Sequence, residues 1–170
     1  MEMEKPMGNY VVTFSTFVLQ PIRFGNRILT YVIERDREID VPKKPIHIMK
    51  SSAAFYGSSF QVLTKTSKLI LGNVHKTPIL LAHAYDTPCI FIPTLSPSSD
   101  QNVWINCLAI DFIEPDPLGC VVHLENGRKL KLAVSANTMW RQYCFARFLE
   151  KDFFKKQHLL NKSAYLFKPE

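Results

Sequence analysis

Acidic residues are absent from positions 41–85, although the same window contains six lysines. The remaining positions hold 15 basic and 15 acidic residues, so the net charge of +6 arises within this window. Serines and threonines lie between the lysines, and this composition suits a surface that contacts phosphate groups. On composition alone, a solvated basic surface is the simpler explanation of such a charge run.

Long hydrophobic runs and paired cysteines are absent as well. No apolar run approaches the ~20 residues of a membrane-spanning helix, and the first residues lack the basic and apolar regions of a secretory signal. No CxxC spacing occurs, which argues against a zinc site or a redox pair. We therefore expect a cytoplasmic protein with no membrane segment, whose cysteines are reduced and buried.

Catalytic motifs are also missing from the sequence. It contains no phosphate loop, no GxGxxG and no GxSxG, and its five histidines show neither HxxxH nor HExxH spacing. Asp111, Glu114 and Asp116 crowd one predicted turn, but three acids around two prolines are better explained as a solvated loop than as a metal site. We expect no enzyme activity, no cofactor and no metal.

The size and composition indicate one folded domain. The chain has 170 residues, of which 46% are hydrophobic and 12% aromatic, and it shows no repeat or linker. Segments rich in β-branched and aromatic residues predict strands. We expect strands over 10–19, 27–33, 46–49, 78–82, 89–92 and 103–113, with a Gly25-Asn26 turn after the first and an exposed turn at 35–40.

Two short helices are expected inside the lysine window. Small hydroxyl residues favour N-cap positions, and the candidates are Ser51 or Ser52 for the first helix and Ser58 or Ser59 for the second. Gly57 is expected to end the first helix, and the second is expected to reach Leu69.

The C-terminal third begins with the clearest hairpin. Alternating apolar positions at 121–124 and 130–134 flank Glu125-Asn126-Gly127-Arg128, and Asn-Gly favours a type I′ turn. Asn137 is then expected to cap a long helix over 138–158, followed by a short, partly extended tail over 159–170. The predicted fold class is therefore α+β: a mainly antiparallel sheet, short helices in the middle and a long C-terminal helix.

The long helix has more apolar surface than one contact requires. Arg147, Lys151 and Lys155 recur at i, i+4 and i+8 and form one basic stripe. Large apolar residues, including Tyr143 and Phe148, occupy much of the remaining circumference and must be covered. Either a second subunit covers the excess, or the whole helix is buried within the monomer.

Several sequence blocks identify a family resemblance. They are A-F-Y-G-S-S-F at Ala54 to Phe60, His75-Lys76-Thr77-Pro78, I-P-T-L-S at Ile92 to Ser96, Trp104-Ile105 and the E-N-G-R hairpin. Together with the start of the terminal helix they run from about Lys50 to Phe154. In order and spacing the chain resembles the ComK family of competence transcription factors of Gram-positive bacteria. The first forty residues match loosely, and the C-terminus is shorter than in the best-known members.

The resemblance implies a DNA-binding transcription activator of the genes for DNA uptake. Family members recognise paired AT-rich boxes, chiefly through the minor groove, as dimers that assemble in pairs, and they use no cofactor. No helix–turn–helix with a basic second helix is convincing in the sequence, which agrees with that mode. The alternative is a protein-interaction module, or a diverged paralogue that has lost DNA binding.

The resemblance transfers no individual contact residues, so we infer them from the basic window and the hairpin. The predicted DNA-binding residues are Lys50, Ser51, Ser52, Ser58, Ser59, Lys65, Lys68 and Lys76, with Arg128 and Lys129 as a second element. Phe55 is expected in the core, and the block around it is expected to hold the loop in shape.

The chain end is a candidate partner segment. Tyr165, Leu166 and Phe167 place three large apolar groups near the terminus. Activators of the resembled family are delivered to a Clp-type protease by an adaptor, and this segment looks like a diverged version of the motif that such an adaptor binds. Docking of these side chains on the protein's own surface is the alternative. The predicted dimer or partner contacts are Tyr143, Phe148, Tyr165, Leu166 and Phe167.

Overall fold

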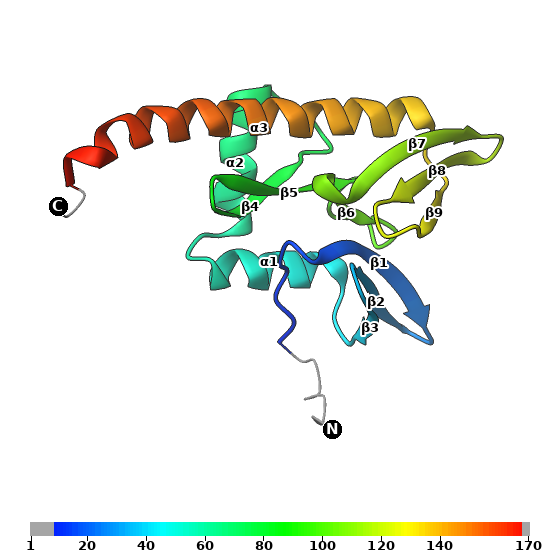
Figure 1. The fold of residues 1–170 in the computed structure, drawn as a ribbon. Helices are drawn as coiled ribbons and strands as arrows, with labels where there is room; N and C mark the ends of the chain where they lie inside the picture. The colour runs from blue at the N-terminus through cyan, green and yellow to red at the C-terminus, as the bar shows by residue number, and fades with distance from the viewer. Residues whose placement is uncertain (1–8, 168–170) are drawn as a thin grey trace.

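The computed structural model describes residues 9–167, which form two antiparallel sheets and three α-helices (Figure 1). The larger sheet has the strand order β3-β2-β1-β6-β5-β4, and the smaller has the order β7-β8-β9. The last helix, at the C-terminal end, is the longest of the three. The predicted α+β class, with antiparallel strands, middle helices and a long terminal helix, is confirmed.

The six-stranded sheet comes from two separate parts of the chain. Its strands are β1 (Thr16–Phe24), β2 (Arg27–Glu34), β3 (Glu38–Val41), β4 (Ile79–Ala84), β5 (Thr87–Pro93) and β6 (Trp104–Asn106). The antiparallel pairing of β1 with β6 joins the two parts, with Val18 opposite Ile105 and Leu19 opposite Trp104. Segments that are distant in the sequence therefore meet at the centre of this sheet.

The first strand begins later than expected. Residues 10–15 precede β1 because their backbone is bonded to side chains of a helix instead of to a strand. The Val12 N–H donates to Ser52 Oγ at 3.0 Å, and the Val12 carbonyl accepts from Tyr56 Oη at 2.5 Å. The predicted strand over 10–19 is therefore correct only in its second half.

The predicted strand over 103–113 is wrong as a single element. It splits into β6 and β7 (Ile110–Asp116), which belong to different sheets. A 3₁₀ turn, η1 (Cys107–Ala109), separates them, and the Asn106 side chain caps it by accepting the Leu108 N–H at 3.0 Å. The acids 111, 114 and 116 therefore lie on an edge strand and not in a loop; Pro115 is tolerated there because β7 is an edge.

The three-stranded sheet contains the expected hairpin. Strands β8 (Gly119–Leu124) and β9 (Lys129–Leu132) flank the Asn126-Gly127 turn, as predicted. The type I′ assignment is wrong, because only Gly127 has a positive φ (86°), whereas that turn needs one at both central residues. Positive φ at two successive residues occurs instead at Tyr85 and Asp86 (52° and 59°), in the turn between β4 and β5.

The first two helices are α1 (Pro45–Phe55) and α2 (Phe60–Leu71). The predicted strand over 46–49 is wrong because α1 already begins at Pro45, a residue that favours the first helical turn. Ser51 and Ser52 therefore lie inside the helix and do not cap it. Ser59 is confirmed as the cap of α2: its Oγ accepts the Val62 N–H at 3.2 Å.

The terminal helix α3 (Ala136–Ala164) is longer than predicted. Ser135, and not Asn137, is its N-cap, and Ser135 Oγ accepts the Thr138 N–H at 3.2 Å. The tail expected to be partly extended is helical and ends in the 3₁₀ turn η2 (Tyr165–Phe167). No glycine or proline occurs between Gly127 and Pro169, so nothing in the sequence stops the helix after 158.

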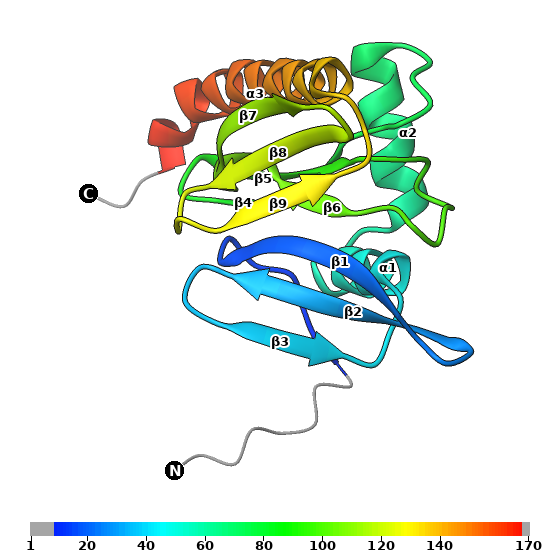
Figure 2. The same ribbon diagram turned by 90° about the vertical axis from the view of Figure 1, so that its right-hand side faces the viewer.

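The six-stranded sheet separates two layers (Figure 2). On one face, α1 and α2 cover a core that includes Leu19, Phe91 and the fully buried Trp104. On the other face, the three-stranded sheet and α3 cover a second core. Gln142 ties α3 to the central sheet, because its Nε2 donates to the carbonyls of Lys76 and Pro93 at 2.7 and 3.1 Å.

Candidate nucleic-acid interface

The acid-free window forms the end of β3, α1, α2 and β4, so neither α1 nor α2 contains an acidic residue. The outward side of α1 exposes Lys50 and Ser51. On α2, Gln61, Lys65 and Lys68 follow the i, i+4, i+7 spacing of one helical face, and all three are exposed. The two helices thus present lysines to solvent on the side of the sheet that they cover.

These lysines have no counterion within the part of the chain that the structure describes. None of Lys50, Lys65 and Lys68 forms an ion pair with a carboxylate among residues 9–167. At the edge of the window, Lys44 Nζ lies 3.2 Å from Asp100 Oδ1. A surface with unpaired lysines and no nearby acid of its own attracts a polyanion without repelling it.

Most predicted contact residues of the window are accessible. Lys50, Ser51, Ser59, Lys65 and Lys68 are exposed, whereas Ser58 and Lys76 are half-buried. Ser52 was wrongly included, since it is fully buried. Its hydroxyl holds the N-terminal segment through the Val12 N–H and is not available to a ligand.

The helices α1 and α2 are joined by the four residues 56–59, which include Gly57 at φ 84°. In Figures 1 and 2 the two helices run across one another. The sequence did not predict this pair, because the first helix was expected to be short and 46–49 to be a strand. Two crossed helices joined by a short glycine-containing turn are an arrangement in which helix–turn–helix units also occur.

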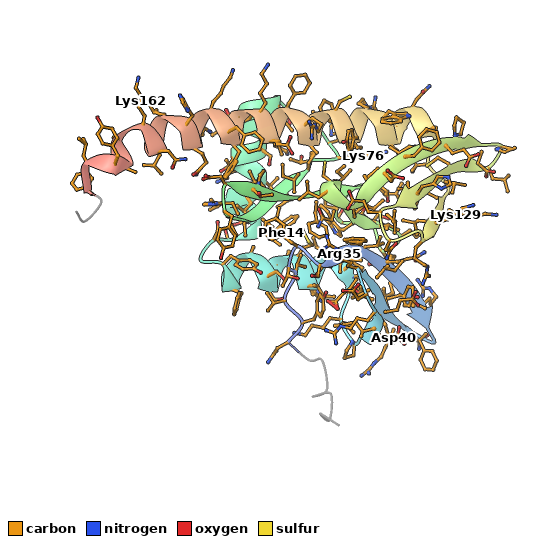
Figure 3. All side chains as sticks on the ribbon, viewed as in Figure 1. Phe14, Arg35, Asp40, Lys76, Lys129 and Lys162 are labelled. Carbon is orange, nitrogen blue, oxygen red and sulfur yellow. The ribbon has the colours of Figure 1, made fainter. Side chains whose placement is uncertain are left out.

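The predicted DNA-binding residues of the β8–β9 hairpin do not lie on the same surface as those of α1 and α2. Arg128 is ion-paired with Glu38, and the Asn126 amide approaches the Glu34 carbonyl at 3.4 Å. The β8–β9 turn lies at the opposite edge of the molecule from α1 and α2 in Figure 2, and Figure 3 shows Lys129 at the other side of the molecule from Lys162, near the outer end of α3. Arg128 and Lys129 therefore belong to a different surface from the lysine window.

The end of the β1–β2 hairpin is a basic element that was predicted only as a turn. Arg23, Phe24 and Arg27 are exposed there around Gly25-Asn26. The available signal was the pair of arginines on either side of an aromatic residue and a turn, in a segment with no acid from 15 to 33.

The aromatic residues near α1 include one wrong assignment. Phe55 was expected in the core, but it is 69% exposed and packs edge-on against Tyr56, with ring centroids 5.2 Å apart. Tyr56 does hold the loop in shape through its bond to the Val12 carbonyl.

The long helix α3 packs against the sheets on one side and exposes large apolar side chains on the other. Met139, Leu149 and Phe153 are buried against the sheets, while Phe148 and Phe154 are exposed. Tyr143 is half-buried, and burial raises its pKa. The outer half of α3 extends beyond the sheets in Figure 1. At its end Tyr165, Leu166 and Phe167 are exposed, so docking of these side chains on the protein's own surface is not what the structure contains.

Reactive side chains do not gather at one place. Burial raises the pKa of the Cys89 and Cys107 thiols to about 12, so both remain protonated at neutral pH and are poor nucleophiles. Cys120 is buried as expected, but Cys144 is exposed, contrary to expectation. Within residues 9–167 no three His, Cys, Asp or Glu side chains are grouped to hold a metal ion. None of the helices described here has the length and apolar composition to cross a membrane.

The described residues thus combine a three-layer α+β fold with an exposed basic surface. The sequence matches the ComK protein family over residues 7–158, which is most of the chain, and the protein belongs to that family. It is 26% identical over 151 residues to the competence transcription factor of Bacillus subtilis (strain 168), covering 88% of this chain and 78% of that protein. No solved structure matches the chain.

Proposed function

We propose that the protein is a DNA-binding activator of competence genes, with one DNA-binding domain over 1–170. The observation that carries the proposal is the surface of α1 and α2, which contain no acidic residue and on which Lys50, Lys65 and Lys68 are exposed and have no ion-pair partner among residues 9–167. Membership of the ComK family and the similarity to a competence transcription factor support the same conclusion.

The proposed target is a pair of AT-rich boxes recognised through the minor groove. Runs of A·T pairs narrow this groove and deepen its negative potential, so cationic side chains favour it. The lysines of α1 and α2 would contact the phosphates beside the groove and supply the salt-dependent part of the affinity.

A second candidate mode is favoured by the crossed pair α1 and α2. In this mode α2 would enter the major groove, with Gln61 and Lys65 facing the base edges. The two modes predict different responses to inosine–cytosine pairs, which keep the minor-groove pattern of A·T but change the major-groove pattern.

The deciding experiment is a mobility-shift titration with three duplexes of equal length. They carry A·T boxes, inosine–cytosine boxes or G·C boxes. Minor-groove recognition predicts that the first two bind alike and the third binds weakly. Major-groove recognition by α2 predicts that only the A·T duplex binds tightly. Equal weak binding to all three would refute sequence-specific recognition of AT boxes.

The protein is proposed to act as a homodimer or a pair of dimers. Paired boxes need paired subunits, and α3 exposes Phe148 and Phe154 beside the half-buried Tyr143. The exposed Tyr165, Leu166 and Phe167 are proposed as the segment that a proteolytic adaptor binds, since an accessible apolar segment at a chain end suits a groove on another protein.

A further inference from the structure

The β1–β2 hairpin extends beyond the sheet that contains it. Strand β6 pairs with β1 only at Val18 and Leu19, and β3 pairs with β2 only from Thr30 to Ile33. The pairing of β1 with β2 nevertheless continues to Phe24 and Arg27. Residues 21–29 therefore form a two-stranded ribbon with no neighbouring strand on either side, and it projects from the molecule in Figure 2.

The end of this ribbon is basic and apolar at once. Phe24 is 74% exposed, and Arg23 and Arg27 on either side of the turn are exposed as well. Neither arginine forms an ion pair with a carboxylate among the residues described. A largely exposed aromatic side chain between two exposed arginines fits a polyanionic partner that also offers apolar surface.

The base of the ribbon joins the lysine window. Thr30 Oγ1 donates to the Lys43 carbonyl at 2.6 Å, and Ile28 lines a hollow together with Lys44 and Pro45 at the start of α1. The nearby acid Asp100 accepts from Lys44. The base of the ribbon therefore adjoins the start of α1, and Asp100 lines a hollow with Arg23 as well.

We propose that the tip of the β1–β2 hairpin enters the minor groove of DNA, with Phe24 wedged between base pairs and Arg23 and Arg27 along the groove. This inference rests on the proposed function and specifies its site. The minor groove is only about 6 Å wide, which excludes a helix but admits arginine and aromatic side chains from a ribbon tip. Apolar wedges of this kind unstack a base step and kink the duplex, and A·T-rich sequences contain the easily deformed TA step.

The test measures bending as well as binding. A duplex with two AT boxes carries a donor and an acceptor dye at its ends, and energy transfer reports the bend angle. We expect Phe24→Ala to bind the duplex about tenfold more weakly and to lose most of the bend. The salt slope, which is the decrease in the logarithm of the affinity with the logarithm of the salt concentration, should not change, because no phosphate contact is lost. Replacing Arg23 and Arg27 together with alanine should lower the salt slope by about two units.

Two further variants make the result specific. Leu118→Ala is the matched control, since Leu118 is 87% exposed in the β7–β8 turn next to Asp116 instead of arginine; it should bind and bend as the wild type does. Phe24→Leu should keep most of the bend, because leucine also acts as a wedge. Thermal unfolding of each variant verifies that it is folded.

The possible outcomes distinguish a failure of the hairpin proposal from a failure of the proposed function. If the wild type binds the duplex without bending it, or if Phe24→Ala bends it equally, the wedge is refuted while DNA binding stands. If replacing Arg23 and Arg27 with alanine leaves the salt slope unchanged, the tip of the β1–β2 hairpin does not contact DNA. If the wild type shows no preference for the AT duplex, the proposed function itself is refuted, and the hairpin assignment with it.

Discussion

The two basic regions of the molecule differ in what surrounds their cations. On α1 and α2, Lys50, Lys65 and Lys68 have no carboxylate partner among residues 9–167. On α3, by contrast, Arg147 lies 2.8 Å from Glu150 and Lys156 lies 2.7 Å from Asp152. Surface ion pairs of this kind add little stability, but they reduce the positive potential that a polyanion would experience.

The long helix α3 also exposes many large apolar side chains. The outward side and the C-terminal end of α3 expose Phe148, Phe154, Leu159 and Leu160, and the η2 side chains are exposed as well. A helix on which two cations are ion-paired and several large apolar side chains are exposed suits a protein partner, whereas the lysines of α1 and α2, two helices without an acidic residue, suit DNA. The difference indicates that the two ends of one chain serve different kinds of partner, although both are rich in lysine and arginine.

The largest expected effect tests whether the inner part of α3 is structural. Leu149 is 1% exposed in the core between the sheets and the helix. Leu149→Ala should reduce the free energy of unfolding by about 2–5 kcal/mol, because it removes buried methyl groups and leaves a cavity. Urea denaturation measures the loss. Phe154→Ala, on the exposed side, should change it by no more than about 0.5 kcal/mol; an equal loss would show that the outer side is also packed.

The next prediction tests whether the lysines of α2 contact DNA. Lys65→Ala with Lys68→Ala should weaken binding to any duplex about tenfold and lower the salt slope by roughly one unit for each lost phosphate contact. Titrations from low to moderate salt give the slope. The control replaces Arg147 and Lys156 on α3, which are ion-paired with Glu150 and Asp152, and we expect little change. If the two double variants behave alike, the lysines of α2 are not at the DNA interface.

The sequence predicted these lysines and the outline of the fold because the signals are local. The hairpin at Gly127, the Ser59 cap and the amphipathic start of α3 each depend on neighbouring residues. What it could not predict depends on distant partners. Ser52 is unavailable because it binds the Val12 N–H, and Arg128 lies apart from the lysine window because it pairs with Glu38.

The same reason explains the missed ribbon. Whether Arg23 and Phe24 project into solvent depends on where β3 and β6 stop pairing, and β6 lies about eighty residues further along the chain (Val18 pairs with Ile105). Periodicity identifies β1 and β2 as strands, but it does not show that their ends lack neighbours.

The third prediction concerns assembly through the exposed side of α3. Phe148→Asp should weaken self-association by at least about tenfold, because it places a charge in an apolar contact. Its effect on folding should be small, since Phe148 is 57% exposed. Sedimentation equilibrium of the wild type and the variant measures the difference. A wild type that is monomeric both alone and on DNA would contradict the proposed dimer.

The smallest expected effect on DNA binding comes from the chain end, where the partner is proposed to be an adaptor. Deleting residues 163–170 removes the exposed Tyr165, Leu166 and Phe167, which lie at the end of α3 far from α1 (Figure 1). DNA affinity should stay within about twofold, or roughly 0.4 kcal/mol, while the lifetime of the protein in the cell increases. Pulse-chase measurements give the lifetime, and replacing only Tyr165, Leu166 and Phe167 with serine separates these side chains from chain length. Because the three side chains bury nothing in the monomer, a loss of folding stability would show that the segment packs within an assembly, and an unchanged lifetime would remove it as the adaptor site.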